Sequence, residues 1–126
     1  MNNGLTIPET ALKDKERLKI NVLGEKYSIV VTNRRDEPKL SEASGLCDDS
    51  IKKIIVDDYS DRHNLTAKED LTEEIKRTLR HEIVHAFLCE SGLACSSEWA
   101  MNEEIVDWIA LQGPKLYKAW QEAGAV

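Results

Sequence analysis

The chain lacks the features that mark membrane proteins and exported proteins. None of its 126 residues belongs to an apolar run that approaches the ~18 residues needed to span a membrane. Residues 1–19 contain no apolar core of the kind found in signal peptides. We therefore expect a cytoplasmic protein that is neither exported nor inserted in a membrane.

Cysteine is scarce in the chain, and positive charge is outnumbered by negative charge. An odd number of cysteines (Cys47, Cys89 and Cys95) is typical of free thiols in a reducing compartment. The chain has 17 Lys and Arg residues and 23 Asp and Glu residues, so its formal net charge is −6. Because phosphate binding depends on clustered basic residues, this balance disfavours a nucleic-acid partner and favours a peptide or a small molecule.

The chain does contain enough apolar residues for one modest core. Hydrophobic residues make up 41% and charged residues 32%, which is typical of a soluble globular protein. A length of 126 residues supports one domain rather than two. We expect the polar residues 1–17 to form a loose N-terminal arm and residues 18–126 to form the domain.

The first half of this domain has the pattern of β-strands. In residues 18–33 apolar residues alternate with polar ones and strand-forming residues follow Gly24, which predicts a β-hairpin. A second pair of strands is predicted around residues 48–50, with residues 51–56 as its clearest strand. The two lysines in that strand favour an exposed edge of the sheet, where charge discourages aggregation.

The second half has the pattern of helices. Residues 66–69 have the spacing of a capping box, and apolar residues then recur at every fourth position from 71 to 87. Gly92 is expected to end this helix, and a second helix is predicted for residues 97–112, separated by residues 113–114 from a short last helix. Strands followed by helices predict an α+β fold, in which a small antiparallel sheet packs on two or three helices.

The most informative residues form an HExxH motif at positions 81–85. His81 and His85 lie one helical turn apart on one face, so both imidazoles can reach one ion. Zinc favours imidazole nitrogen, and a catalytic zinc site keeps one coordination position for water. Glu82 lies beside the pair and is placed to accept a proton from that water. The motif therefore predicts a zinc site with Glu82 as the general base.

A catalytic zinc site needs a third protein ligand, and the second predicted helix carries several acids. If that helix folds back on the first, Glu103 faces the histidines, and Asp107, one turn on, can accept the N–H of a ligating ring. Glu98, Glu104 and Asp107 are rival ligands, although Glu104 is turned by about 100° from Glu103. Cys89 continues the face of the histidines, but a free cysteine is usually a small buried hydrophobic residue.

In these residues the chain resembles the gluzincin metallopeptidases, in which HExxH is followed by NExxxD. Asn102, Glu103 and Asp107 match that second motif, and Glu103 lies 18 positions after His85. In size and layout the chain is also similar to the minimal ImmA/IrrE-type peptidases of prophages and mobile elements. The resemblance implies a zinc ion held by both motif histidines and Glu103, with Asp107 bonded to a ligand.

The motif and the resemblance together predict a zinc metallopeptidase that hydrolyses a peptide bond. We expect the strand at residues 51–56 to pair with an extended substrate if it borders the cleft. The residue that stabilises the oxyanion is left open between His63, Tyr59, Tyr117 and Arg80. The alternative is a non-catalytic, zinc-stabilised protein-binding module of a phage or mobile element, in which the metal staples a small core.

Overall fold

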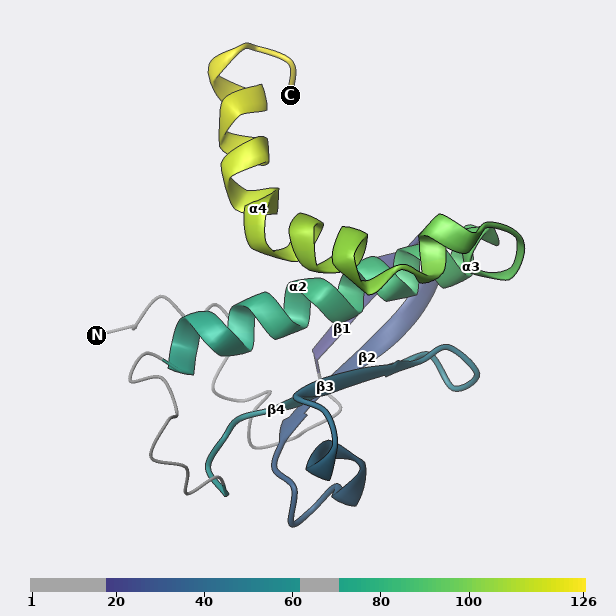
Figure 1. Ribbon diagram of the computed structural model, residues 1–126, viewed down its shortest axis with the longest axis vertical. Helices are drawn as coiled ribbons and strands as arrows, with labels where there is room; N and C mark the ends of the chain where they lie inside the picture. Colours follow the sequence, from purple (N-terminus) through teal and green to yellow (C-terminus); the bar gives the residue numbers. More distant parts are fainter. Residues whose placement is uncertain (1–17, 62–70) are drawn as a thin grey trace.

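The computed structural model describes residues 18–61 and 71–126, in which one sheet packs against one long helix (Figure 1). The strands are β1 (Leu18–Val22), β2 (Glu25–Thr32), β3 (Gly45–Asp48) and β4 (Lys53–Asp57). The helical elements are η1 (Pro38–Ser41), α2 (Leu71–Glu90), α3 (Leu93–Ser96), η2 (Glu98–Met101) and α4 (Glu103–Glu122). The predicted α+β fold is confirmed, whereas the N-terminal arm and the capping box at residues 66–69 lie outside the described residues.

The sheet is mixed, so the prediction of a purely antiparallel sheet is wrong. Both predicted hairpins form, because β1 pairs with β2 and β3 pairs with β4 in antiparallel fashion. The two hairpins are joined by a parallel pairing of β2 with β4, in which Val30 lies opposite Ile55. Both of these central strands carry unbroken apolar runs, because each of their faces is covered.

The strand predicted to lie at a sheet edge is an interior strand. The order β1-β2-β4-β3 places β4 between two partners and leaves β1 and β3 at the edges. Ile54 and Val56 are fully buried, and Lys52 lies in the turn before β4 rather than in the strand. Lysine is therefore a misleading edge signal here, since the charge belongs to the turn and to the first position of the strand.

The main core lies between α2 and one face of the sheet. Its buried residues come from three strands and from α2: Val22, Tyr27, Ile29, Val31, Ile54, Val56, Ile75 and Ala86. A smaller cluster on the other face joins Val30 and Ile55 to Leu40 of η1. The predicted apolar stripe of α2 packs on this core through Ile75, Leu79 and Ile83, but Phe87 at its end is 40% exposed.

The C-terminal end of α2 is fastened to both hairpins through Glu90. The hydroxyl of Tyr27 donates to Glu90 Oε1 at 2.8 Å, and the ammonium group of Lys52 bonds the same oxygen. The hydrogen bond from Lys52, followed by that from Tyr27, lowers the pKa of Glu90, whereas burial raises the pKa of Tyr27. These contacts hold α2 at a defined position along the sheet, and with it the histidine motif.

Helix α4 begins later than predicted because Ser97 is extended and Glu98–Met101 form the separate 3-10 helix η2. Asn102 caps α4, and its side-chain oxygen accepts from the backbone N–H groups of Glu104 and Ile105 at 2.8 and 3.3 Å. The cap satisfies two of the free donors at the start of the helix. It therefore makes Glu103 the first residue of α4.

Helix α4 also continues past Gly113 and Pro114, where the sequence predicted a break, and it bends sharply (Figure 1). Pro114 has no N–H to donate to the carbonyl of Ala110, four residues earlier. Arg80 of α2 donates its Nε–H to that carbonyl at 2.6 Å. Because a side chain replaces the missing backbone donor, the helix bends instead of ending. None of the helices in the described part of the chain is long and apolar enough to cross a membrane.

Candidate metal centre

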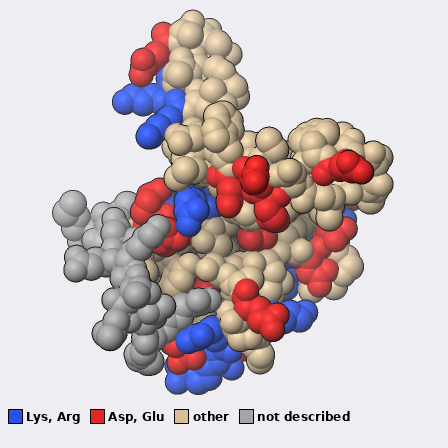
Figure 2. Space-filling model, viewed as in Figure 1, with Lys and Arg blue, Asp and Glu red and all other residues tan. Residues whose placement is uncertain are grey.

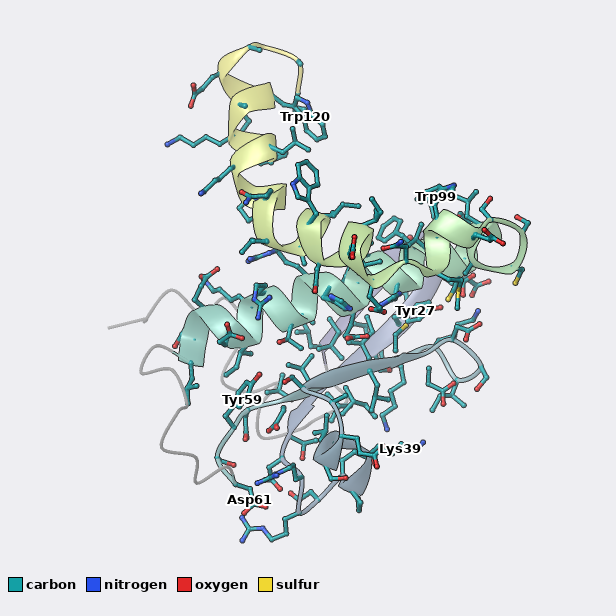
Figure 3. The ribbon with its side chains drawn as sticks, in the orientation of Figure 1. Tyr27, Lys39, Tyr59, Asp61, Trp99 and Trp120 are labelled. Atoms are coloured by element: carbon teal, nitrogen blue, oxygen red, sulfur yellow. The ribbon has the colours of Figure 1, made fainter. Side chains whose placement is uncertain are left out.

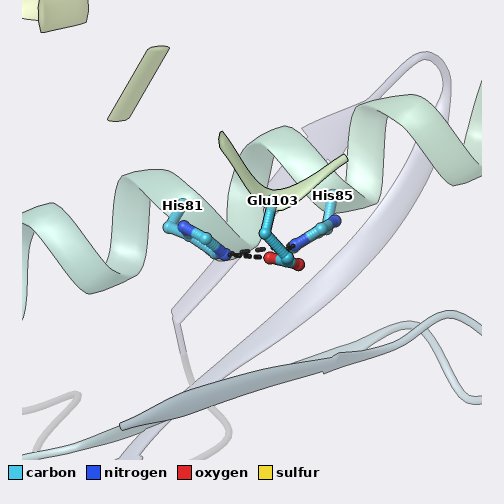
Figure 4. A group of neighbouring side chains, drawn as sticks. All are labelled: His81, His85 and Glu103. Atoms are coloured by element: carbon cyan, nitrogen blue, oxygen red, sulfur yellow. Dashed lines mark hydrogen bonds and ion pairs between the residues drawn. The ribbon is translucent and has the colours of Figure 1, made fainter. Parts of the chain in front are cut away.

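The side chains of His81, His85 and Glu103 converge between α2 and the start of α4 (Figure 4). The Nε2 atoms of the two histidines lie 3.1 Å apart. Glu103 Oε1 lies 2.9 Å from Nε2 of His81 and 3.0 Å from Nε2 of His85. Three atoms with lone pairs thus form a nearly equilateral triangle.

Hydrogen bonds alone cannot pair all three atoms of this triangle. The carboxylate Oδ1 of Asp107 lies 2.8 Å from Nδ1 of His81 and accepts that N–H, so in the neutral ring Nε2 carries a lone pair. That lone pair then faces the carboxylate of Glu103, which is an acceptor as well. A cation would satisfy all three atoms at once, whereas a proton on His85 satisfies only one contact.

The size of the triangle suits a small divalent ion. Two atoms bonded to a tetrahedral zinc ion at about 2.0–2.1 Å lie about 3.3 Å from each other. The observed separations of 2.9, 3.0 and 3.1 Å are close to this value. His81, His85 and Glu103 could therefore hold a metal ion, and no other such group of three converges within residues 18–61 and 71–126.

The rival ligands considered from the sequence do not join the group. Glu104 is exposed and turned away from the histidines, as its helical position requires. Neither Glu98 nor Cys89 is among the converging side chains. Burial raises the pKa of the Cys89 thiol, which disfavours the thiolate that a metal would need. Among the acids of α4, the structure brings Glu103 and Asp107 to the histidines.

Glu82 lies beside the histidines in a pocket of about 440 Å³. Only 7% of its surface is exposed. Burial raises the pKa of its carboxyl, an effect opposed by the nearby His81 and His85. The pocket is lined by Ala43, Ser44, Gly45, Glu74, Arg77, Thr78, His81, Glu82, His85, Glu103 and Asp107. A buried carboxylate thus shares one cavity with the three converging ligand atoms.

One wall of the pocket is the start of edge strand β3. A Cβ atom added to Gly45 would lie 2.7 Å from Thr78 Cγ2 and 3.2 Å from Glu82 Cγ. Glycine is therefore required for the strand to approach α2 this closely. An isolated glycine in a strand pattern is the sequence signal that could have revealed this contact.

Arg77 is a pocket residue that sequence reasoning missed. It is the only Lys or Arg among the described residues that line the cavity. Its Nη2 bonds both carboxylate oxygens of Glu74, at 3.1 and 2.9 Å, and this contact raises the pKa of the guanidinium. Arg77, His81 and His85 are spaced four residues apart, so helical spacing alone could have placed the arginine on the histidine face.

None of the oxyanion candidates named from the sequence lines the pocket in the described part of the chain. Tyr59 packs on the main core, and Tyr117 is exposed on α4 beyond the bend. Arg80 bonds the Ala110 carbonyl and Glu73. His63 lies outside the described residues. Of the described arginines and lysines, Arg77 alone is left as a candidate for this role.

The fold and the site define a small α+β protein whose two helices present a His–His–Glu group able to hold a metal ion. Residues 10–125 match the family described as "Peptidase of plants and bacteria", and the chain belongs to this family. Comparison with curated proteins and with solved structures gave no match. Membership confirms a peptidase and implies a peptide or protein substrate, while the ImmA/IrrE-type resemblance stays a prediction.

Proposed function

We propose that the protein is a zinc-dependent peptidase of the zincin type. His81, His85 and Glu103 would hold the ion, with Glu82 as the general base. The observation that carries the proposal is the triangle of three lone-pair atoms, with sides of 2.9–3.1 Å, beside a buried carboxylate. Three protein ligands leave one position for water, whereas structural zinc sites are usually closed by four.

In this mechanism the residues of the chain transfer protons and keep the ligand side chains in position. When bound, a zinc ion supplies an acidified water and polarises the scissile carbonyl. Glu82 accepts the proton of the attacking water and then delivers it to the leaving amine. Asp107 orients the His81 ring through the bond to Nδ1.

We further propose that β3 aligns the substrate. The strand at residues 51–56, which the sequence favoured for this role, is paired on both sides, with β2 and β3, and has no edge to offer. Strand β3 lies at the edge of the sheet, and residues 43–45 line the pocket. An extended peptide added along β3 would lie beside the pocket that Glu82 lines.

A direct test combines metal analysis, cleavage and stability. Protein prepared with zinc should contain one zinc per chain by elemental mass spectrometry and should cleave members of a peptide library. Chelation should stop cleavage and leave the circular dichroism spectrum nearly unchanged, because none of the three ligand residues belongs to the main core. If chelation unfolds the protein and no peptide of the library is cut, the protein is instead a binding module whose fold the metal stabilises.

Arg77 is expected to bind the substrate rather than to act in the chemical step. Arg77→Gln should raise KM about tenfold, as expected for loss of one hydrogen bond to a charged group, with little change in kcat. Its partly exposed pair with Glu74 contributes little to folding, so the variant should remain folded. The control Arg77→Lys keeps the charge, and its KM should lie between that of the parent and that of Arg77→Gln. A decrease confined to kcat would show instead that Arg77 stabilises the oxyanion of the transition state.

A further inference from the structure

All three tryptophans of the chain are half exposed, and they lie close together in the sequence. The exposed fractions are 50% for Trp99, 55% for Trp108 and 46% for Trp120. Figure 3 shows Trp99 on η2 and Trp120 near the C-terminal end of α4, both well away from the sheet. Tryptophan is mostly buried in folded proteins and is enriched at interfaces, so three exposed copies indicate a surface that meets a partner.

These tryptophans belong to a set of large exposed apolar side chains on η2 and α4, which we call the elbow. Its principal members are Trp99, Trp108, Leu111, Leu116, Tyr117 and Trp120. Side chains of this size, each about half exposed, present on the order of 600 Å² of apolar surface. This is most of the roughly 800 Å² that each partner contributes to a standard interface.

Half of the elbow lies on the C-terminal arm, the segment 114–126 beyond the bend of α4. Every residue of this arm is exposed. Before the bend, α4 packs on its neighbours through Val106 and Ala110, which are buried. A helix as short as the arm is marginal in water without packing. The arm therefore lacks, within the described residues, the contacts that would stabilise it as a helix.

The charges of α4 favour a second copy of the chain as the partner. The arm carries Lys115, Lys118 and one acid, Glu122, whereas the start of the helix carries Glu104, which is exposed and outside the converging group. Figure 2 shows the charged side chains on one side of the arm and uncharged residues over the rest of the visible surface. Two α4 helices that pair antiparallel bring the two lysines of each copy toward Glu104 of the other. Antiparallel pairing also opposes the two helix dipoles.

We propose that the elbow is the interface of a homodimer, in which the arm of each copy packs across the exposed side of the other copy's α4. A two-fold axis joins the same patch from both copies, so one self-complementary surface is sufficient. An anionic membrane surface is a poorer partner, because the formal net charge of −6 opposes binding to it.

Analytical ultracentrifugation of the full chain tests this proposal. The expected mass is twice 14.3 kDa, falling to that of the monomer on dilution. Trp120→Glu and Leu116→Glu should each weaken dimerisation about 30-fold or more, as expected for an anchor residue. The matched control is Ile51→Glu, since Ile51 is 61% exposed but lies in the turn before β4. Tryptophan emission should shift to shorter wavelength as the protein concentration rises.

Two results would overturn the dimer. The first is a folded monomer at concentrations up to about 100 µM, a range in which even a weak specific interface associates. The second is a dimer that both arm substitutions leave unchanged. Each variant is checked by circular dichroism, so that loss of the fold is not read as loss of the interface. A monomer that binds vesicles of phosphatidylcholine and phosphatidylglycerol through the arm would assign the elbow to a membrane and also reject the proposal.

Discussion

Glu82→Gln should lower kcat for peptide hydrolysis by about 10²–10⁴-fold, the usual contribution of a general base. The amide has the size of the carboxylate and suits a side chain that is only 7% exposed, but it cannot accept the proton of the attacking water. The three ligand side chains are untouched, so zinc should remain at one per chain. The measurement is steady-state cleavage of a library-derived peptide, with elemental analysis of the same preparation.

The matched control for this substitution is Glu104→Gln. It makes the same chemical change at an exposed carboxylate outside the converging group. Its activity and zinc content should stay within about twofold of the parent, as is usual for exposed positions. Hydrolysis retained by Glu82→Gln would remove Glu82 from the role of base, whatever the metal content shows.

Glu103→Gln should weaken zinc binding by about 100-fold or more. Loss of a partner that merely hydrogen-bonds a ligand costs about 10–100-fold in affinity, and Glu103 is the only carboxylate in the converging group. Its loss leaves two neutral imidazoles to hold the ion. Competition with a chromophoric zinc chelator measures this affinity directly, independent of any catalytic assay.

The same measurement decides between neighbouring glutamates. Glu104→Gln should bind zinc like the parent, because its side chain is turned away from both histidines. If Glu104→Gln loses zinc and Glu103→Gln keeps it, the third ligand is Glu104 and the helix has a different rotation in solution. If both variants keep zinc, another residue supplies the third ligand.

Much of this architecture could be predicted from the sequence because it depends on local geometry. The spacing of His81 and His85 places both rings on one face of any helix, and Asp107 follows Glu103 by one turn in the same way. Both hairpins join strands that are neighbours in the chain, so turn residues and alternation were sufficient to predict them. The α+β class follows from the order of these local patterns.

The remaining features depend on residues far apart in the chain, and only the tertiary structure decided them. The parallel pairing of β2 with β4 joins two hairpins and makes β3 the edge beside the pocket. Arg80 reaches the carbonyl that Pro114 leaves without a donor, so α4 bends where the sequence predicted an end. Gly45 meets Glu82 only after the sheet has packed on α2. Periodicity describes which way a side chain points along its own element, but which element it meets depends on packing across the core.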